Sequence, residues 1–176
     1  MLQNKKVLTL TNIIIGLTII AYIIQINIPN GSLWLGLNIY FFNNELYYQL
    51  LSSIFSHGGV EHLLMNMFVL WQFGNMIEDY LGKFKFFIIY IVGGILTSIG
   101  TLAYMYYFND WANVVGASGA ISVLIGFVAL RVPDMRKGMV IWILFISFAP
   151  LLIGLPIAWY SHLIGFAIGF IMGFIL

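Results

Sequence analysis

The sequence predicts an all-α polytopic membrane protein that forms a single domain over residues 1–176. Apolar residues make up 62% of the chain and charged residues only 7%, whereas soluble domains carry about 25% charged residues. Long apolar segments recur along the chain and are separated by short stretches that contain Pro, Gly or charged residues. The chain has no cysteine, which excludes disulfides and thiolate metal sites.

The apolar segments predict six membrane-spanning helices. A helix needs about 20 mostly apolar residues to cross the bilayer. By this measure we expect spans at approximately 7–28, 60–77, 86–108, 117–130, 139–155 and 157–176. Turn signals separate them, such as Pro29-Asn30-Gly31 after the first span and Pro133 after the fourth. The first span is too long for a signal peptide and lacks a small-residue cleavage site, so we expect it to remain uncleaved.

The basic residues predict the orientation of these spans. All seven lie before span one, between spans two and three, or between spans four and five: Lys5, Lys6, Lys83, Lys85, Arg131, Arg136 and Lys137. Connections rich in Lys and Arg stay in the cytoplasm. We therefore expect both termini to be cytoplasmic.

Two segments have unusual lengths. From Ser118 to Leu130 the fourth span is about 20 Å long as a helix, against roughly 30 Å of hydrocarbon. If Arg131 lies at the cytoplasmic surface, Ser118 lies below the outer surface, beneath an irregular segment that lines a cavity. The first outer loop, residues 29–56, is rich in Trp, Tyr and Phe, which favour the membrane interface. We expect a partly embedded loop; the alternative is a solvated one.

A few polar residues interrupt the apolar segments on the outer side. Ionisable groups inside a membrane are costly and suggest function. His57, His62 and His162 are the three histidines, and Asn66 shares a helix face with His62, four residues before it. Each of these residues, like Ser118, follows an outer connection. The topology therefore predicts a serine, a possible base and other polar side chains at similar depth.

Small residues predict which helices meet. They recur at spacing four on spans four and six: Ser118, Ser122, Gly126, Gly165, Gly169 and Gly173. Such stripes let membrane helices approach closely. If the two stripes meet, Ser118 and His162 come into contact. The alternative is that the glycines only pack helices and that His162 only hydrogen-bonds a carbonyl.

Four motifs lie in order along most of the chain. They are Ser56-His57-Gly58-Gly59 with His62-Leu63-Leu64-Met65-Asn66, then Gly74, Glu78 and Gly82, then Gly116-Ala117-Ser118-Gly119, then Ser161-His162-Leu163-Ile164-Gly165 with Gly169. In this order and spacing they resemble the motifs of the rhomboid intramembrane serine proteases. The resemblance implies a six-transmembrane-helix rhomboid bundle.

The resemblance also implies roles for individual residues. Ser118 would be the nucleophile and His162 the general base and acid of a catalytic dyad. The Ser118 backbone N–H would stabilise the oxyanion together with the His62 and Asn66 side chains, and the N-terminal dipole of span four favours negative charge there. Supporting positions are His57, Gly116, Gly119, Gly165 and Gly169. None of the six carboxylates lies near His162 in sequence, so no acidic third member is expected.

Two positions depart from the family pattern. Where family members often have a Trp-Arg pair, this chain has Tyr48-Gln49. Where a tyrosine commonly stacks on the catalytic histidine, this chain has Ser122. His162 would then lack that ring, and Phe127 or Trp159 is a candidate replacement.

The predicted activity is hydrolysis of single-span membrane proteins near the outer side of the bilayer. No cofactor or metal is expected, since the His-Glu-x-x-His signature is absent. Nucleic-acid binding is not expected either, since the sequence has no basic tail. The resemblance implies substrate access between spans two and five, past Trp142 and Phe145, in the plasma (inner) membrane of a prokaryote. Water would reach the site from outside, past Ser52, Ser53, Ser56 and His57.

Two other functions compete with proteolysis. A catalytically inactive rhomboid-like protein that binds membrane clients would be expected to lack the serine or the base, and both are present. A small transporter or channel would use His62, Asn66 and His162 along an ion path. It predicts carboxylates within the spans or internal repeats, and the spans contain almost no carboxylates apart from Glu61.

Overall fold

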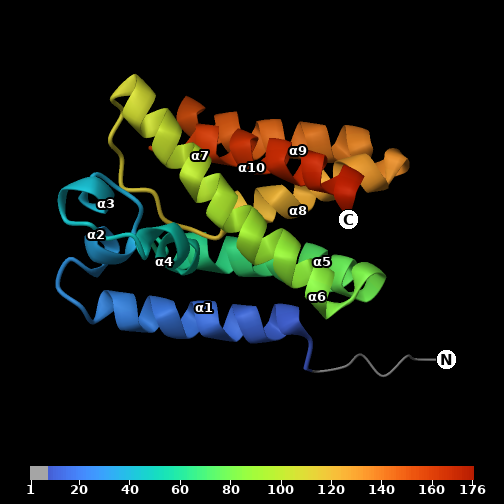
Figure 1. The fold of residues 1–176 in the computed structure, drawn as a ribbon, viewed down its shortest axis with the longest axis horizontal. Helices are drawn as coiled ribbons and strands as arrows, with labels where there is room; N and C mark the ends of the chain where they lie inside the picture. The colour runs from blue at the N-terminus through green and yellow to red at the C-terminus, as the bar shows by residue number, and fades with distance from the viewer. Residues whose placement is uncertain (1–7) are drawn as a thin grey trace.

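The computed structural model describes residues 8–176 and is all-helical over that range. Lys5, Lys6 and residue 7 of the predicted first span lie outside the described residues. The elements in chain order are α1 Leu10–Ile26, α2 Gly31–Leu35, α3 Tyr40–Asn43, α4 Gln49–Phe55, α5 Val60–Leu81, α6 Lys83–Phe87, the π-helical η1 Ile88–Val92, α7 Gly93–Phe108, α8 Ser118–Arg131, α9 Pro133–Leu152 and α10 Trp159–Ile175. The long helices run along the long axis of the molecule, and α2–α4 gather at one end (Figure 1).

A helix occupies each of the six predicted segments, with shifted ends. α5 continues to Leu81, where Gly82 with a positive φ of 82° ends it. α9 begins at Pro133 rather than at 139, because proline is favoured in the first turn of a helix, where its missing N–H costs nothing. α6, η1 and α7 form one continuous helical stretch from Lys83 to Phe108.

Two helical stretches of the described chain are long and apolar enough to cross a membrane, Lys83–Phe108 and Pro133–Leu152. Three other apolar helices are shorter: Leu10–Ile26, Ser118–Arg131 and Trp159–Ile175. The count of six spans therefore stays a prediction. The all-helical fold class is confirmed for residues 8–176.

α8 is the central helix of the bundle. Every residue from Gly119 to Ala129 is buried, as expected for a helix that is apolar on all sides and lies inside a protein. α5, α7, α9 and α10 all contact it. At the C-terminal end of α8, Arg136 donates to the carbonyl oxygens of Ala129 at 2.9 Å and Leu130 at 3.3 Å. The last carbonyl oxygens of a helix receive no hydrogen bond from within it, so Arg136 supplies the missing donors. The first residue of this enclosed helix is Ser118.

Residues 27–59, between α1 and α5, fold into three short helices rather than an irregular loop. Buried Gln49 joins α4 to α2, since its amide nitrogen donates to the carbonyl oxygens of Leu33 and Trp34 at 3.2 Å. Leu37 forms an isolated antiparallel bridge with Val114, in the segment before α8. This region is thereby fixed to the segment that leads into Ser118. Whether it is embedded in the bilayer stays a prediction.

α1 is joined to α5 through a buried carboxylate. Glu78 accepts hydrogen bonds from the backbone N–H groups of Leu10 and Thr11 and from the Thr11 hydroxyl, each at 2.8 Å. The first N–H groups of a helix lack acceptors within it, so the Glu78 carboxylate supplies acceptors for the first turn of α1. Gly74, one turn earlier on α5, lies directly against the Thr11 side chain.

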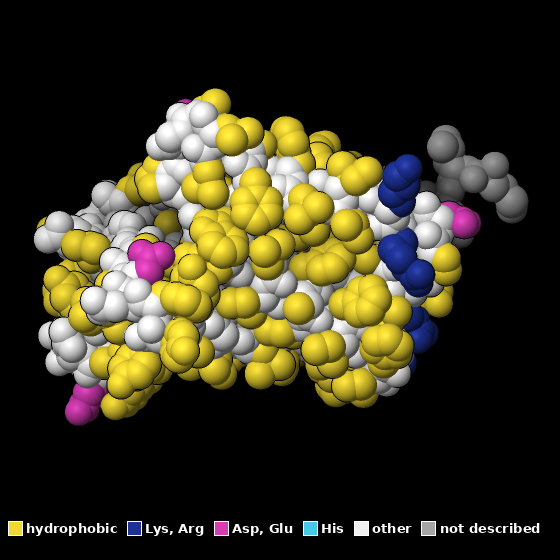
Figure 2. All heavy atoms as spheres, turned by 90° about the horizontal axis from the view of Figure 1, so that it is seen from above, with side chains coloured by type: hydrophobic (Ala, Val, Ile, Leu, Met, Phe, Trp, Pro, Cys, Tyr) yellow, Lys and Arg dark blue, Asp and Glu magenta, His cyan; other side chains and the backbone are white. Residues whose placement is uncertain are grey.

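The surface between the two ends of the molecule is largely apolar. Large side chains are exposed on the outer faces of the long helices, including Leu64, Phe145 and Phe174. On the face seen in Figure 2, hydrophobic side chains cover most of the surface and the Lys and Arg side chains lie at one end. The basic residues of the described chain begin α6, end α8 or lie in the first turns of α9.

Candidate active site

The Ser118 hydroxyl and the His162 ring lie in hydrogen-bonding contact. His162 Nε2 is 3.0 Å from Ser118 Oγ. Ser118 is the first residue of α8, and His162 lies in the first turn of α10. His162 is 9% exposed, so the pair is largely shielded from solvent. The predicted neighbours on spans four and six are thus brought together.

Glycines on α8 and α10 allow this contact. A Cβ at Gly165 would collide with the Gly119 carbonyl oxygen, and one at Gly169 would collide with the Val123 carbonyl oxygen. A Cβ at Gly126 would collide with the Phe166 carbonyl oxygen. The two helices therefore touch backbone to backbone, as small residues permit. The two predicted stripes meet along this contact.

His62 and Asn66 lie against the turn before Ser118. Gly116 has a φ of 125°, and a Cβ there would meet His62 Cε1 at 2.6 Å and Asn66 Nδ2 at 3.7 Å. Only glycine fits both this backbone conformation and this close approach. The Gly58 N–H donates to His62 Nδ1 at 3.5 Å, so neutral His62 carries its proton on Nε2. Asn66 Nδ2 donates to the His62 carbonyl oxygen at 2.9 Å.

His57 also contacts the turn before Ser118. Its Nε2 accepts from the Ala117 N–H at 3.4 Å, and its Nδ1 lies 3.4 Å from the Phe55 carbonyl oxygen. Gln25 of α1 bonds both the N–H and the carbonyl oxygen of His57, at 2.9 and 2.8 Å. Burial, followed by the neighbouring His62, lowers the pKa of His57 to about 4, while the Phe55 hydrogen bond raises it. His57 is therefore uncharged at neutral pH.

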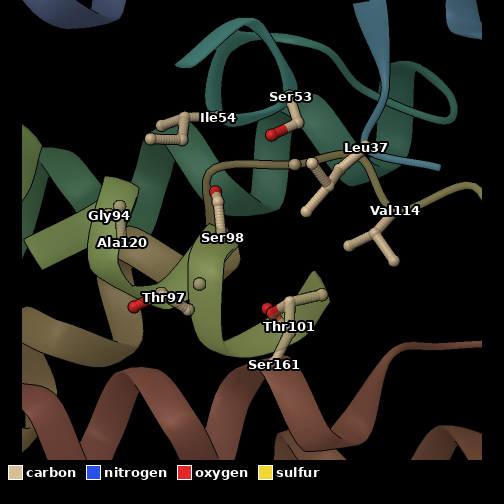
Figure 3. Close-up of a pocket in the computed structure, with 12 residues that line it drawn as sticks. Leu37, Ser53, Ile54, Gly94, Thr97, Ser98, Thr101, Val114, Ala120 and Ser161 are labelled. Atoms are coloured by element: carbon tan, nitrogen blue, oxygen red, sulfur yellow. The ribbon is translucent and has the colours of Figure 1, made fainter. Parts of the chain in front are cut away.

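A small cavity lies beside the turn before Ser118, lined by the backbone of Gly116 and Gly119. Five hydroxyl side chains from three helices contribute to its wall (Figure 3): Ser53 of α4, Thr97, Ser98 and Thr101 of α7, and Ser161 of α10. The cavity of about 20 Å³ can hold one water molecule, which needs roughly 10–15 Å³ on this measure. The buried Thr101 hydroxyl has no hydrogen-bond partner within the described chain.

The polar residues of the expected water path divide into two kinds. Ser53 lines the cavity. The Ser52 hydroxyl donates to the Leu35 carbonyl oxygen at 2.7 Å, and the Ser56 hydroxyl donates to the Ser52 carbonyl oxygen at 3.0 Å. The hydroxyls of Ser52 and Ser56 are thus both hydrogen-bonded to backbone carbonyl oxygens.

The two departures from the family pattern have local explanations. Gln49 is completely buried and bonds backbone carbonyl oxygens of α2, a task for which a neutral amide suffices. The Ser122 hydroxyl donates to the Ser118 carbonyl oxygen at 2.7 Å. Trp159 packs against Tyr104, Phe148 and Tyr160. Within residues 8–176 neither Trp159 nor Phe127 stacks on His162.

The sequence did not point to three polar residues at this site. Ser147 of α9 lies 3.5 Å from His162 Nδ1, Gln25 holds His57, and Thr101 lines the cavity. Ser147 had a detectable signal, because it is the one hydroxyl residue in the predicted span 139–155. Within the described chain, no group of three or more His, Cys, Asp or Glu side chains is placed to hold a metal ion.

An apolar groove lies between α5 and α9. Its volume is about 350 Å³, and its lining residues are Met65, Phe68, Val69, Gln72, Phe73, Gly138, Met139 and Trp142. Trp142 is also in ring contact with Phe145, whose side chain is exposed. The groove separates the two helices named in the predicted access route.

Comparisons with known proteins point to one family. The family model described as Rhomboid domain matches residues 44–176. YdcA of Bacillus subtilis (strain 168), which its name assigns provisionally to the rhomboid proteases, is 33% identical over 147 residues, covering 80% of this chain and 72% of that protein. Presenilin-associated rhomboid-like protein A, mitochondrial, of Danio rerio is 32% identical over 89 residues. That match covers 51% of this chain and only 23% of the Danio rerio protein, so the chain spans less than a quarter of this relative.

Proposed function

The chain belongs to the rhomboid family, and from that premise we propose that it is an intramembrane serine endopeptidase. It is a membrane protein by family. We further propose that it is a single domain of six spans, that it needs no cofactor or metal, and that its substrates are single-span membrane proteins. The proposal is carried by one observation, the 3.0 Å contact between Ser118 Oγ and His162 Nε2.

The proposed reaction uses this dyad twice. His162 Nε2 takes the proton as Ser118 Oγ bonds to the scissile carbonyl carbon. It then gives that proton to the leaving amine as the C–N bond breaks, which leaves an acyl ester on Ser118. Water hydrolyses the ester with the same histidine as base. The hydroxyl-lined cavity beside Gly116 and Gly119 is a suitable store for that water.

The proposed oxyanion site lies at the start of α8. The Ser118 N–H is one of the first four of its helix and has no acceptor within it. His62 supports the site because its Nδ1 accepts from Gly58, which leaves an Nε2–H donor beside Gly116. Asn66 adds an amide close to the same glycine. Each such donor is typically worth about 2.7–4 kcal/mol of transition-state stabilisation.

We propose that a substrate helix reaches the dyad through the groove between α5 and α9. The groove is lined mainly by apolar side chains, which suit a membrane segment. Peptide hydrolysis requires an extended chain, so the substrate helix must unwind near the cut. Trp142 and Phe145 would be displaced on entry.

The proposed location is the plasma (inner) membrane of a prokaryote, with both termini cytoplasmic. Support comes from the basic side chains gathered at one end of the molecule and from the tendency of such ends to face the cytoplasm. The dyad lies toward the opposite end, at the starts of α8 and α10. The active site would then open to the outer side.

The test is active-site labelling of the detergent-purified protein with a fluorophosphonate probe. We expect labelling of the wild type and none of Ser118→Ala or His162→Ala. Ser122→Ala is the matched control, because it deletes another buried hydroxyl on the same helix and should label normally. Cleavage of a model single-span substrate in vesicles should follow the same order. Unchanged cleavage by both dyad variants would exclude the protease, and a folded wild type without labelling or cleavage would favour a client-binding protein.

A further inference from the structure

The second nitrogen of the His162 ring has its own partner on α9. His162 Nδ1 lies 3.5 Å from Ser147 Oγ. Ser147 is fully buried and His162 nearly so. From Met139 to Leu152 the other side chains of α9 are apolar, so this hydroxyl is an exception among them.

The proposed dyad needs one tautomer of His162. A neutral imidazole has one N–H and one nitrogen lone pair. To take the Ser118 proton, the lone pair must be on Nε2, which faces Ser118 Oγ. The proton must then be on Nδ1, where a buried N–H is costly without an acceptor. Ser147 Oγ lies where that acceptor is needed.

Other groups that could hold the ring are missing or turned elsewhere within the described chain. Within residues 8–176, no carboxylate is hydrogen-bonded or ion-paired to His162, and no aromatic ring stacks on it. Ser122 occupies the position of the usual family tyrosine, but its hydroxyl donates to the Ser118 carbonyl oxygen. The distance of 3.5 Å to Ser147 is at the upper limit for a hydrogen bond, and catalytic hydrogen bonds are often long before substrate binds.

We propose that Ser147 is a positioning residue that accepts the Nδ1–H of His162 and so keeps Nε2 free to act as the base. This inference rests on the proposed function of the dyad. When Nε2 takes the Ser118 proton, the imidazolium keeps its Nδ1–H on Ser147 Oγ. The proton on Nε2 then passes to the leaving amine, so Ser147 itself gains and loses no proton. α9 thus supplies a polar group to a site otherwise built from α5, α8 and α10.

The direct test is the tautomer of His162, measured by ¹⁵N NMR of the imidazole rings in detergent. The chain has only three histidines, and His162→Gln identifies the His162 signals. We expect the Nδ1–H tautomer in the wild type and a shift toward the Nε2–H tautomer in Ser147→Ala. An unchanged tautomer in Ser147→Ala would overturn the proposal, whatever the activity.

The second readout is the rate of fluorophosphonate labelling. We expect Ser147→Ala to slow it about tenfold, less than the roughly 10⁴-fold loss known when an ionised partner of a catalytic histidine is replaced and the wrong tautomer results. Ser147→Thr keeps the hydroxyl and should recover most of the rate. Thr18→Ala, which deletes a buried hydroxyl bonded to the backbone of α1, should label as the wild type does.

The variants separate the possible failures. Ser147→Cys keeps the volume but is a weak acceptor, so it should behave like Ser147→Ala even if the alanine variant does not fold. Equal labelling by wild type, Ser147→Cys and Ser147→Thr would overturn the positioning role. If the wild type does not label, the proposed function fails, and the NMR measurement still decides whether Ser147 sets the tautomer.

Discussion

At the α8–α10 contact, glycines bring backbone against backbone, whereas at the α1–α5 contact a buried carboxylate joins the helices by hydrogen bonds. Gly165 and Gly169 lie against carbonyl oxygens of α8, and the position of His162 relative to Ser118 follows from that approach. Glu78 holds α1 through three hydrogen bonds of 2.8 Å. α1 does not carry any residue of the dyad.

The two contacts have different roles: the α8–α10 contact sets the geometry of the Ser118–His162 pair, and the α1–α5 contact adds to the stability of the fold. A backbone contact has no flexible side chain that can adjust, so a single added methyl group must move a helix. A side-chain hydrogen bond can be lost while the helix axes stay in place. We therefore expect changes at the α8–α10 contact to reduce catalysis directly, and changes at the α1–α5 contact to reduce stability.

The largest effect is expected for Gly165→Ala. Its Cβ would collide with the Gly119 carbonyl oxygen and lie 3.0 Å from the Ser122 Cβ, next to the dyad. Overpacking of this kind costs about 1–3 kcal/mol, and we expect fluorophosphonate labelling to fall at least about tenfold, since small misplacements cost up to about 10² in rate. The control is Gly16→Ala, where a Cβ on α1 meets no atom within 4 Å. Equal labelling by both variants would show that the glycine contact does not position the dyad.

The next effect is expected for Glu78→Gln. The amide has only one acceptor oxygen, and its NH₂ group would face the donors of α1. Hydrogen bonds to charged groups contribute about 1.5–3 kcal/mol each, so we expect a stability loss of about 2 kcal/mol. Detergent-based unfolding measures this loss, with exposed Glu61→Gln on the same helix as the control. Labelling below the unfolding transition should remain close to the wild type; a tenfold loss there would mean that α1 also positions the dyad.

Much of the fold could be predicted because apolar segments and turn residues mark the long helices. The helices α5 and α9 extend beyond the predicted spans, since Asp79 and Arg136 interrupt the apolar pattern without ending the helix. The short helices between α1 and α5 were missed. They depend on long-range bonds of Gln49 and on the bridge between Leu37 and Val114, which local sequence does not encode.

The candidate site was predictable where residues form a motif or a stripe. Ser118 and His162 could be paired because small residues repeat beside both. Ser147 and Gln25 could not be assigned to the site, because each is a single polar residue. The cavity could not be predicted, because its lining comes from several distant segments. Their roles depend on which helices are neighbours, and an isolated hydroxyl such as that of Ser147 indicates only that some partner is needed.

A smaller effect is expected for Thr11→Val, which removes one of the three bonds to Glu78 and keeps the side-chain shape. The loss should be about 1 kcal/mol, the usual net value of one hydrogen bond. Combined with Glu78→Gln, the two losses should not add, because both variants remove the same bond. Strict additivity in unfolding experiments would show that the Thr11 hydroxyl does not depend on Glu78.

The smallest effect concerns His57, where the two regions meet. Gln25 of α1 holds its backbone, and its Nε2 accepts from Ala117, just before Ser118. Because burial lowers the pKa of His57 from 6.5 to about 4, the unfolded chain binds a proton between these values that the folded chain does not. Stability should therefore fall as the pH drops through 6.5 toward 4, and it should become insensitive to this group only about one pH unit above 6.5.

The pH step from 7 to 6 isolates this contribution at about 0.7 kcal/mol, as expected for a histidine that titrates only when unfolded. His57→Gln removes the titrating group and leaves His62 and His162 in both proteins. We expect the wild type to lose more stability over this step than the variant does. Parallel losses would mean that His57 is protonated in the folded protein. A protonated ring cannot accept a hydrogen bond from the Ala117 N–H. The turn before Ser118 would then be held by the glycine contact of α8 and α10, without help from α1.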